Sequence, residues 1–142
     1  MISIEKLSKK YIDDIYNIEC VCFPHPWSKA DLEAQLSLDT SHFLVAVCGG
    51  KAVGYMGLQI FFGEGYVTNV AVLPDFRRQG IAEMLIEKQL ENDMDFISLE
   101  VRKSNLPAIS LYKKLGFETV GIRPHFYTSP DEDAVIMTRN KL

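Results

Sequence analysis

A basic turn that contains one glycine is the first segment of the sequence whose residue types could bind a ligand. It spans Arg77–Ala82 and follows the apolar run Val70–Leu73. Such a turn at a helix start directs backbone N–H groups toward one point, where the helix dipole adds partial positive charge, so a pyrophosphate could sit there. With a single glycine and no Walker A lysine, the segment is neither a dinucleotide fingerprint nor a nucleotide-hydrolysis loop. A solvated basic turn is an equally good interpretation of these residues alone.

Three polar residues could support proton transfer or binding beside such an anion site. In the run Phe96–Val101, alternation puts Glu100 opposite the apolar side chains, and a carboxylate in mid-strand is costly unless it is paired or used. Tyr112 lies on an apolar helix stripe and faces inward, and Asn105 precedes that helix. Taken singly, each has a structural interpretation: an ion pair with Arg102, a core tyrosine, and a helix N-cap.

The hydrophobic pattern that must position these residues predicts one α/β domain with a mixed sheet. Two prolines, Pro24 and Pro26, end the first helix, and the pair Gly49-Gly50 suits a two-residue hairpin turn. We expect strands at 2–7, 43–48, 52–62, 66–73, 96–101, 117–122 and 134–138. Helices are expected at 8–22 (capped by Ser8), 28–36 (capped by Ser28), 80–94 and 105–115 (capped by Ser104 or Asn105).

The overall composition limits the class of protein. A length of 142 residues predicts one compact domain, and a net charge of −4 argues against nucleic acid as the main partner. No apolar run reaches the roughly 20 residues that span a bilayer, so we expect a cytoplasmic protein with no membrane partner. The three cysteines and three histidines lack zinc-ligand spacing, so no metal is predicted.

Two motifs follow one another along the chain. The first is Arg77-x-x-Gly80-x-Ala82 after a buried strand, and the second is Asn105-x-x-Ala108-x-x-Leu111-Tyr112-x-x-x-Gly116-Phe117. Together they resemble the GCN5-related N-acetyltransferase (GNAT) family. The resemblance implies an α/β, single-domain GNAT-like fold over residues 1–142, with a mixed, mostly antiparallel sheet of about seven strands flanked by about four helices.

Within that family, four stretches resemble the RimI-type enzymes, which acetylate the N-terminal alanine of a small-subunit ribosomal protein. These stretches are Phe23–Ser28, Asn69–Val72, Leu99–Asn105 and Arg123–Met137. The resemblance therefore covers nearly the whole chain. It implies that the partner is a protein or peptide N-terminus, with a ribosomal protein as the candidate, and it leaves the oligomeric state open.

The resemblance also implies a role for each matching residue. Glu100 would be the base that accepts the amine proton, and Tyr112 would be the acid that protonates the departing thiolate. Trp27 and Tyr127 would line the peptide site. Acetyl-CoA would be the co-substrate, held by backbone and side-chain groups of Val70, Ala71, Val72, Arg77, Arg78, Gln79, Gly80, Ile81, Ala82, Glu83 and Asn105.

Some residues depart from the family pattern and keep alternatives open. Ala82 stands where many members have glycine, and Glu83 adds a negative charge that predicts weaker phosphate binding. The loop between Tyr127 and Glu132 is shorter than in familiar relatives, and Asp131–Asp133 is either a solvated acidic turn or an acidic rim for a charged peptide N-terminus. A small amine or a lysine side chain is thus an alternative substrate. A non-catalytic acyl-CoA-binding module is a further alternative.

Overall fold

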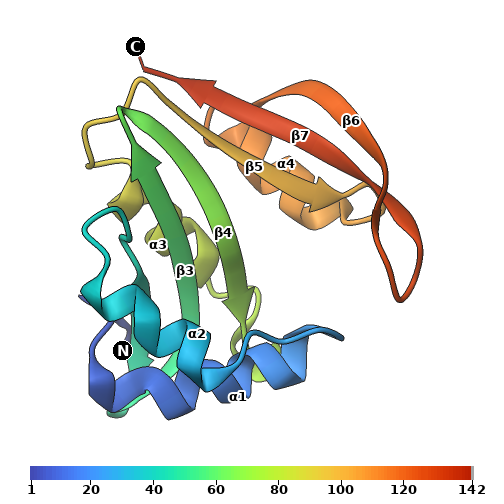
Figure 1. Ribbon diagram of the computed structural model, residues 1–142. Coiled ribbons are helices and arrows are strands. Elements are labelled where there is room, and N and C mark those ends of the chain that lie inside the picture. Colours follow the sequence, from blue (N-terminus) through green and yellow to red (C-terminus); the bar gives the residue numbers. More distant parts are fainter. Residues whose placement is uncertain (142) are drawn as a thin grey trace.

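The computed structural model describes residues 1–141 as one seven-stranded sheet with helices on both faces (Figure 1). The strand order is β1-β2-β3-β4-β5-β7-β6, and all neighbouring strands are antiparallel except β4 and β5. The strands are β1 (Ser3–Lys6), β2 (Leu44–Cys48), β3 (Lys51–Phe61), β4 (Glu64–Val72), β5 (Phe96–Arg102), β6 (Glu118–Tyr127) and β7 (Glu132–Asn140). The helices are α1 (Ile12–Cys22), α2 (Lys29–Ala34), α3 (Ile81–Gln89) and α4 (Leu106–Lys114).

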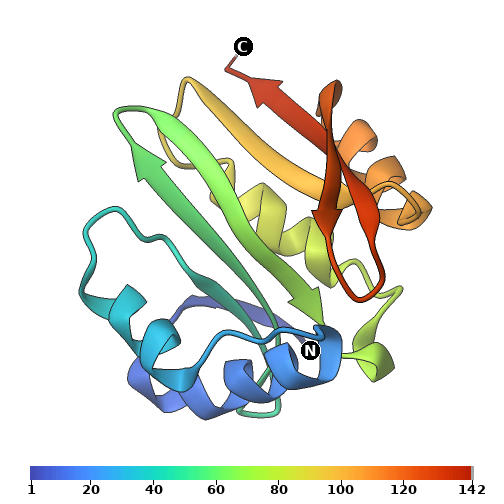
Figure 2. The ribbon, with the colours of Figure 1, turned by 45° about the vertical axis from the view of Figure 1, so that its right-hand side comes forward.

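The two parallel strands, β4 and β5, pair only at their starts. Their pairing covers Glu64–Tyr66 against Phe96–Ser98, and beyond these residues the two strands separate, as Figures 1 and 2 show. A bulge at Thr68, between the residues of β4 that pair with Leu58 and Gly57 of β3, lies at the start of the separation. The last residues of β4 therefore have no strand partner on their β5 side, and their backbone groups can serve a ligand.

Each face of the sheet has its own hydrophobic cluster. Helices α3 and α4 cover one face, where Leu85 and Tyr112 pack with Ile97 of β5. Helices α1 and α2 cover the other face, where Ile15 packs with Tyr55 of β3. Alternation along β5 directs Ile97, Leu99 and Val101 into the first cluster, so Glu100 and Arg102 lie on the face of α1 and α2.

Most predicted elements and their order are confirmed. Gly49 and Gly50 both have positive φ angles, +61° and +81°, and join β2 to β3 as a tight hairpin. Ser28 caps α2, because its hydroxyl accepts a hydrogen bond from the Asp31 N–H at 3.1 Å. Asn105 caps α4 in the same way through Ala108 N–H, at 3.3 Å.

Several predicted boundaries are wrong. Ser8 precedes a 3-10 turn at Lys9–Tyr11 rather than α1 itself, and its side chain makes no cap hydrogen bond. Helix α3 ends at Gln89 rather than near Met94, since Asn92 bonds to Gln89 and closes a turn. Strands β6 and β7 run well beyond their predicted ends. Within residues 1–141, no helix has both the length and the apolar character needed to cross a membrane.

Candidate active site

The basic turn places a glycine-led helix start next to the end of β4. Gly80 has a φ of +77°, and a Cβ added there would meet nothing within 4 Å, so the space above the turn is open. Helix α3 has no side-chain cap, and the Met84 N–H is the one that bonds to the Gly80 carbonyl. Uncapped N–H groups at a helix start suit a pyrophosphate. The side chain of Ile81 is buried in the core, so only its backbone N–H can face that space.

The two arginines of the turn lie in different environments. Arg77 donates from Nε to the Val72 carbonyl at 3.0 Å and from a terminal nitrogen to Cys22 Sγ at 3.6 Å. These contacts join the turn to the end of β4 and to α1 and hold Arg77 in place. Arg78 is exposed, with a φ of +65°, and is the arginine free to reach an anion.

The negative charge of Glu83 is paired. Its carboxylate lies 2.7 Å from Lys114 Nζ, which links the first turn of α3 to the last turn of α4. This hydrogen bond lowers the pKa of Glu83 and raises that of Lys114. The ion pair offsets much of the repulsion that Glu83 would exert on a phosphate at the helix start.

Glu100 forms an ion pair, but with a different partner from the one that the sequence suggested. Its Oε1 lies 3.2 Å from Arg123 Nε of β6, and its side chain is 30% exposed. Arg102 turns instead to Glu132, at 3.2 Å. The difference arises because β7 pairs with both β5 and β6 and so brings Arg123 across from β6. The ion pair uses Oε1 of Glu100, and within residues 1–141 the other carboxylate oxygen has no ion-pair partner.

Two tyrosines in this part of the sheet, Tyr112 and Tyr127, have raised pKa values, and only that of Tyr127 is affected by the charge of Glu100. Burial raises the pKa of Tyr112 to about 12, and the Tyr127 phenol adds to the rise. Burial also raises the pKa of Tyr127 to about 12, with a further contribution from the charge of Glu100. The charge of Glu100 thus acts on Tyr127 and Tyr127 acts on Tyr112, and both phenols stay protonated at neutral pH.

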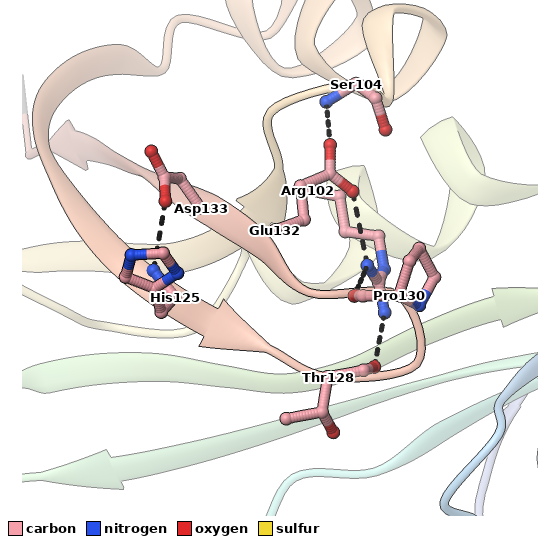
Figure 3. Close-up of polar contacts among 7 residues, drawn as sticks. All are labelled: Arg102, Ser104, His125, Thr128, Pro130, Glu132 and Asp133. Carbon is pink, nitrogen blue, oxygen red and sulfur yellow. Dashed lines mark hydrogen bonds and ion pairs between the residues drawn. The ribbon is translucent and has the colours of Figure 1, made fainter.

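Arg102 organises the hairpin that joins β6 to β7 (Figure 3). Its guanidinium donates to the Pro130 carbonyl at 3.0 Å and to the Thr128 carbonyl at 3.1 Å, and it covers the Tyr127 ring at 4.5 Å. Glu132 bridges the guanidinium to the Ser104 N–H, with a distance of 2.6 Å to that nitrogen. This network explains why both strands extend beyond their predicted ends.

The acidic residues of the hairpin are used within it. Asp131 pairs with His125 Nδ1 at 2.8 Å, and this hydrogen bond raises the pKa of His125. Asp133 accepts the His125 backbone N–H at 2.9 Å. Together with the contacts of Glu132, these bonds give each of the three carboxylates a partner, and the side chain of Asp131 remains 63% exposed.

The two predicted walls of the peptide site meet. His25, in the loop between α1 and α2, lies 3.3 Å from Thr128 of the β6–β7 hairpin through their side chains. Figure 2 shows the hairpin tip beside that loop. Trp27 packs its ring against Phe43, with 6.1 Å between ring centroids. The structure thus places the segments of Trp27 and Tyr127 on the same side of the sheet as Glu100.

A buried polar cluster near this wall was missed by the sequence analysis. Glu19 of α1 accepts hydrogen bonds from Trp27 N–H, from the Tyr55 hydroxyl and from the Asn69 amide. The one available signal was a glutamate on the apolar stripe of α1, between Ile15 and Cys22. Its partners lie up to 50 residues away, so spacing alone could not reveal them.

Comparison with known proteins agrees with this arrangement. The family model for the acetyltransferase (GNAT) family matches residues 12–117. A provisionally named [ribosomal protein bS18]-alanine N-acetyltransferase of Bacillus subtilis (strain 168) is 38% identical over 140 residues, 95% of this chain and 93% of that protein. An N-alpha-acetyltransferase of Saccharolobus solfataricus is 35% identical over 145 residues, 90% of this chain and 86% of that protein.

A solved structure shows the same fold. The crystal structure of the ribosomal-protein-S18-alanine N-acetyltransferase from Escherichia coli superposes with a TM-score of 0.90 at 31% sequence identity, over 99% of this chain and 94% of that chain. The chain therefore belongs to the GNAT family and is an N-acetyltransferase.

Proposed function

We propose that this N-acetyltransferase moves the acetyl group of acetyl-CoA to the N-terminal α-amine of a protein, with alanine as the preferred first residue. A small-subunit ribosomal protein is the proposed natural substrate. Relatives named for the alanine of bS18 and for N-alpha acetylation support this assignment. The observation that carries it is geometric: Glu100, held by Arg123, lies on the face of the sheet where the loop 23–28 meets the β6–β7 hairpin, beside the separated strands β4 and β5.

The residues around the end of β4 fit acetyl-CoA. The open, uncapped helix start at Gly80 and the exposed Arg78 suit its pyrophosphate. The edge of Val70–Val72 has no strand partner on its β5 side and suits the amide groups of the pantetheine arm, with the Val72 carbonyl already bonded to Arg77. When bound, acetyl-CoA supplies an activated thioester carbonyl. Asn105 takes a structural role as the cap of α4, which leaves its amide nitrogen for the cofactor.

Glu100 accepts the proton of the attacking amine, directly or through water. An α-amine with a pKa near 8 is about 90% protonated at pH 7, so the base has only about 1.4 kcal/mol of proton affinity to overcome. Arg123 holds one carboxylate oxygen of Glu100 at 3.2 Å and so fixes the direction of the other. The peptide-side location of Glu100 matches the walls formed by the loop 23–28 and the β6–β7 hairpin.

Tyr112 acts on the opposite face of β5, as a hydrogen-bond donor to the departing sulfur. With a pKa of about 12, its phenol is protonated throughout the neutral range. Complete proton transfer to a thiolate whose conjugate acid has a pKa near 8.5 would be uphill by roughly 5 kcal/mol. A hydrogen bond that stabilises the thiolate therefore contributes more than full protonation, which solvent completes later.

The experiment is acetyl transfer to a peptide library that varies the first residue. We expect release of free thiol from acetyl-CoA only when a peptide with a free N-terminus is present, with Ala-first peptides among the fastest, and mass spectrometry should place the acetyl group on the α-amine. The same peptides with blocked N-termini are the matched control. Binding of acetyl-CoA with no acceptor-dependent thiol release from any peptide would contradict the proposal.

A further inference from the structure

Glu19 is a charged residue in the protein core. Its exposed fraction is 1%, and it lies on α1 among apolar residues of the cluster that includes Ile15 and Tyr55. Burial of a carboxyl group costs several kcal/mol unless its oxygens are satisfied. Here both oxygens have donors. An apolar side chain at this position would leave those donors without an acceptor.

The three donors come from three separate parts of the chain. The Trp27 N–H reaches Oε1 at 2.8 Å, the Asn69 amide reaches Oε2 at 3.2 Å, and the Tyr55 hydroxyl donates a short bond to the same Oε2. Burial and the neighbouring charge of Glu19 raise the pKa of Tyr55 strongly, so its hydroxyl remains a donor. Glu19 thus joins the loop after α1 to β3 and β4.

The two ends of this connection lie at the two halves of the proposed site. Trp27 belongs to the loop that forms one wall of the peptide site. Asn69 directly follows the bulge at Thr68 and precedes Val70–Val72, the edge proposed for acetyl-CoA. Asn69 is 9% exposed, and its Oδ1 has no hydrogen-bond partner within the described residues, so Glu19 is the one group that orients its amide.

We propose that Glu19 is a positioning residue for acetyl transfer: it fixes the position of the loop 23–28, on the peptide side, relative to the β4 edge proposed for acetyl-CoA. This inference rests on the proposed function. Glu19 acts through the Trp27 backbone and the Asn69 amide, and it does not touch the substrate. Loss of the connection should change how the peptide is held relative to the thioester, while the pyrophosphate turn at Gly80 is left intact.

Glutamine at position 19 tests this role sharply because it has the same shape. A carboxylate accepts hydrogen bonds at both oxygens, whereas an amide replaces one acceptor with an NH₂ donor. In Glu19→Gln, an NH₂ that faces the Trp27 N–H loses that bond, whereas an NH₂ that faces Tyr55 and Asn69 requires both donors to turn and act as acceptors. In either orientation the charge-assisted bond to the Trp27 N–H is lost or weakened. Tyr55→Phe removes one donor and keeps the charge, which gives a second and milder variant.

Tyr11→Phe is the matched control. The Tyr11 hydroxyl also donates to a glutamate, Glu5 Oε1 at 3.2 Å, and Tyr11 is 4% exposed within the same cluster. That pair lies between β1 and the turn before α1, away from both walls of the site. Tyr11→Phe therefore reproduces the loss of a tyrosine–glutamate bond without the connection to Trp27 and Asn69.

The measurements are kcat and the two KM values with an Ala-first peptide and acetyl-CoA. We expect Glu19→Gln to raise the peptide KM and lower kcat so that kcat/KM for peptide falls at least ~10-fold. The KM for acetyl-CoA should stay within about two-fold, Tyr55→Phe should fall between Glu19→Gln and wild type, and Tyr11→Phe should match wild type. A variant with a lower melting temperature but wild-type kinetic constants would show a purely structural role and overturn the proposal.

Fluorescence gives a readout that needs no substrate, because Trp27 is the one tryptophan of the sequence. We expect acrylamide to quench Trp27 more strongly in Glu19→Gln than in wild type, and equally in Tyr11→Phe and wild type. Unchanged quenching in Glu19→Gln would overturn the positioning role. A wild-type protein that acetylates no peptide would instead refute the proposed function, so the two failures are distinguishable.

Discussion

At the scale of single residues, the proposed chemistry depends on a carboxylate and a phenol on opposite faces of one strand. Glu100 lies on the peptide side, paired with Arg123, whereas Tyr112 packs on the side of α3 and α4 and is 8% exposed. Because the two groups are separated in this way, the proposed mechanism gives each a single role. In it, Glu100 removes a proton from the amine, and Tyr112 stabilises the sulfur that leaves.

Removal of either group should affect turnover more than cofactor binding. Glu100→Gln removes the base, and we expect kcat to fall about 10²- to 10⁴-fold. Tyr112→Phe removes a hydrogen bond to a charged sulfur, worth about 1.5 to 3 kcal/mol, so kcat should fall roughly 10- to 150-fold. Steady-state kinetics with calorimetry of acetyl-CoA binding checks both. Wild-type turnover in either variant would refute the role given to that residue.

The pKa of Tyr112 predicts the shape of the pH profile. The ionised phenol cannot donate, and with a pKa of about 12 it forms only in strongly alkaline solution. Activity on peptides should therefore rise as the α-amine, with a pKa near 8, loses its proton, and then stay level to about pH 10. Initial rates from about pH 6 to about pH 10 measure this. A decline at the alkaline end of this range that disappears in Tyr112→Phe would contradict the assignment.

At the scale of elements, the turn between β4 and α3 contains two arginines with different expected roles: Arg77 holds the turn in place, and Arg78 binds the cofactor. Arg78→Ala should weaken acetyl-CoA binding by about 1 to 3 kcal/mol without loss of stability, because Arg78 is exposed. Arg77→Ala should also lower the free energy of unfolding, since it removes the contacts with the Val72 carbonyl and Cys22. Calorimetry and denaturant unfolding distinguish the two. Equal effects of both variants on both quantities would show that the turn is not divided in this way.

The bulge in β4 depends on a glycine in the neighbouring strand. A Cβ at Gly57 would overlap the Thr68 hydroxyl and the Phe43 ring. We expect Gly57→Ala to lower the free energy of unfolding by about 1 to 3 kcal/mol through overpacking. Gly121→Ala is the control, because its Cβ would meet only Ile136, at 3.5 Å. Denaturant melts of both variants check this, and equal stability would show that the bulge does not depend on Gly57.

The elements that the sequence predicted well are those with local signals. The Gly49-Gly50 hairpin and the caps at Ser28 and Asn105 each depend on side chains within a few positions. The β6–β7 hairpin was predicted too short because Arg102, some 26 to 30 residues away, holds it. Tertiary contacts of this kind leave no periodic trace in the sequence.

The candidate site also contains residues that the sequence could identify and residues that only the fold brings together. The resemblance placed Glu100 and Tyr112, and the structure puts them on the expected strand and helix. The resemblance could not identify Arg123 as the ion-pair partner of Glu100, because that contact depends on the register of β6 against β7. The cluster around Glu19 combines residues from α1, β3 and β4, and only the folded sheet brings them together.

At the scale of the whole molecule, the separation of β4 and β5 would let acetyl-CoA and the peptide reach the proposed site from two different sides. The uncapped start of α3 suits the phosphates of acetyl-CoA on one side, and the loop 23–28 meets the β6–β7 hairpin on the other. In the proposed mechanism a single carboxylate, that of Glu100, acts on the peptide side. One carboxylate suits an α-amine better than a lysine, because the lysine pKa near 10.4 adds about 3 kcal/mol to the cost of deprotonation at pH 7.

The choice of amine is therefore the most direct test of the proposed function. The measurement is acetyl incorporation at pH 7 into two peptides of one sequence, the first with a free N-terminal Ala and the second blocked there but carrying a lysine, with the modified position read by fragmentation. We predict that the α-amine is acetylated at least ~100-fold faster than the lysine. Comparable rates on lysine, or faster transfer to a small polyamine than to either peptide, would contradict N-terminal acetylation as the function.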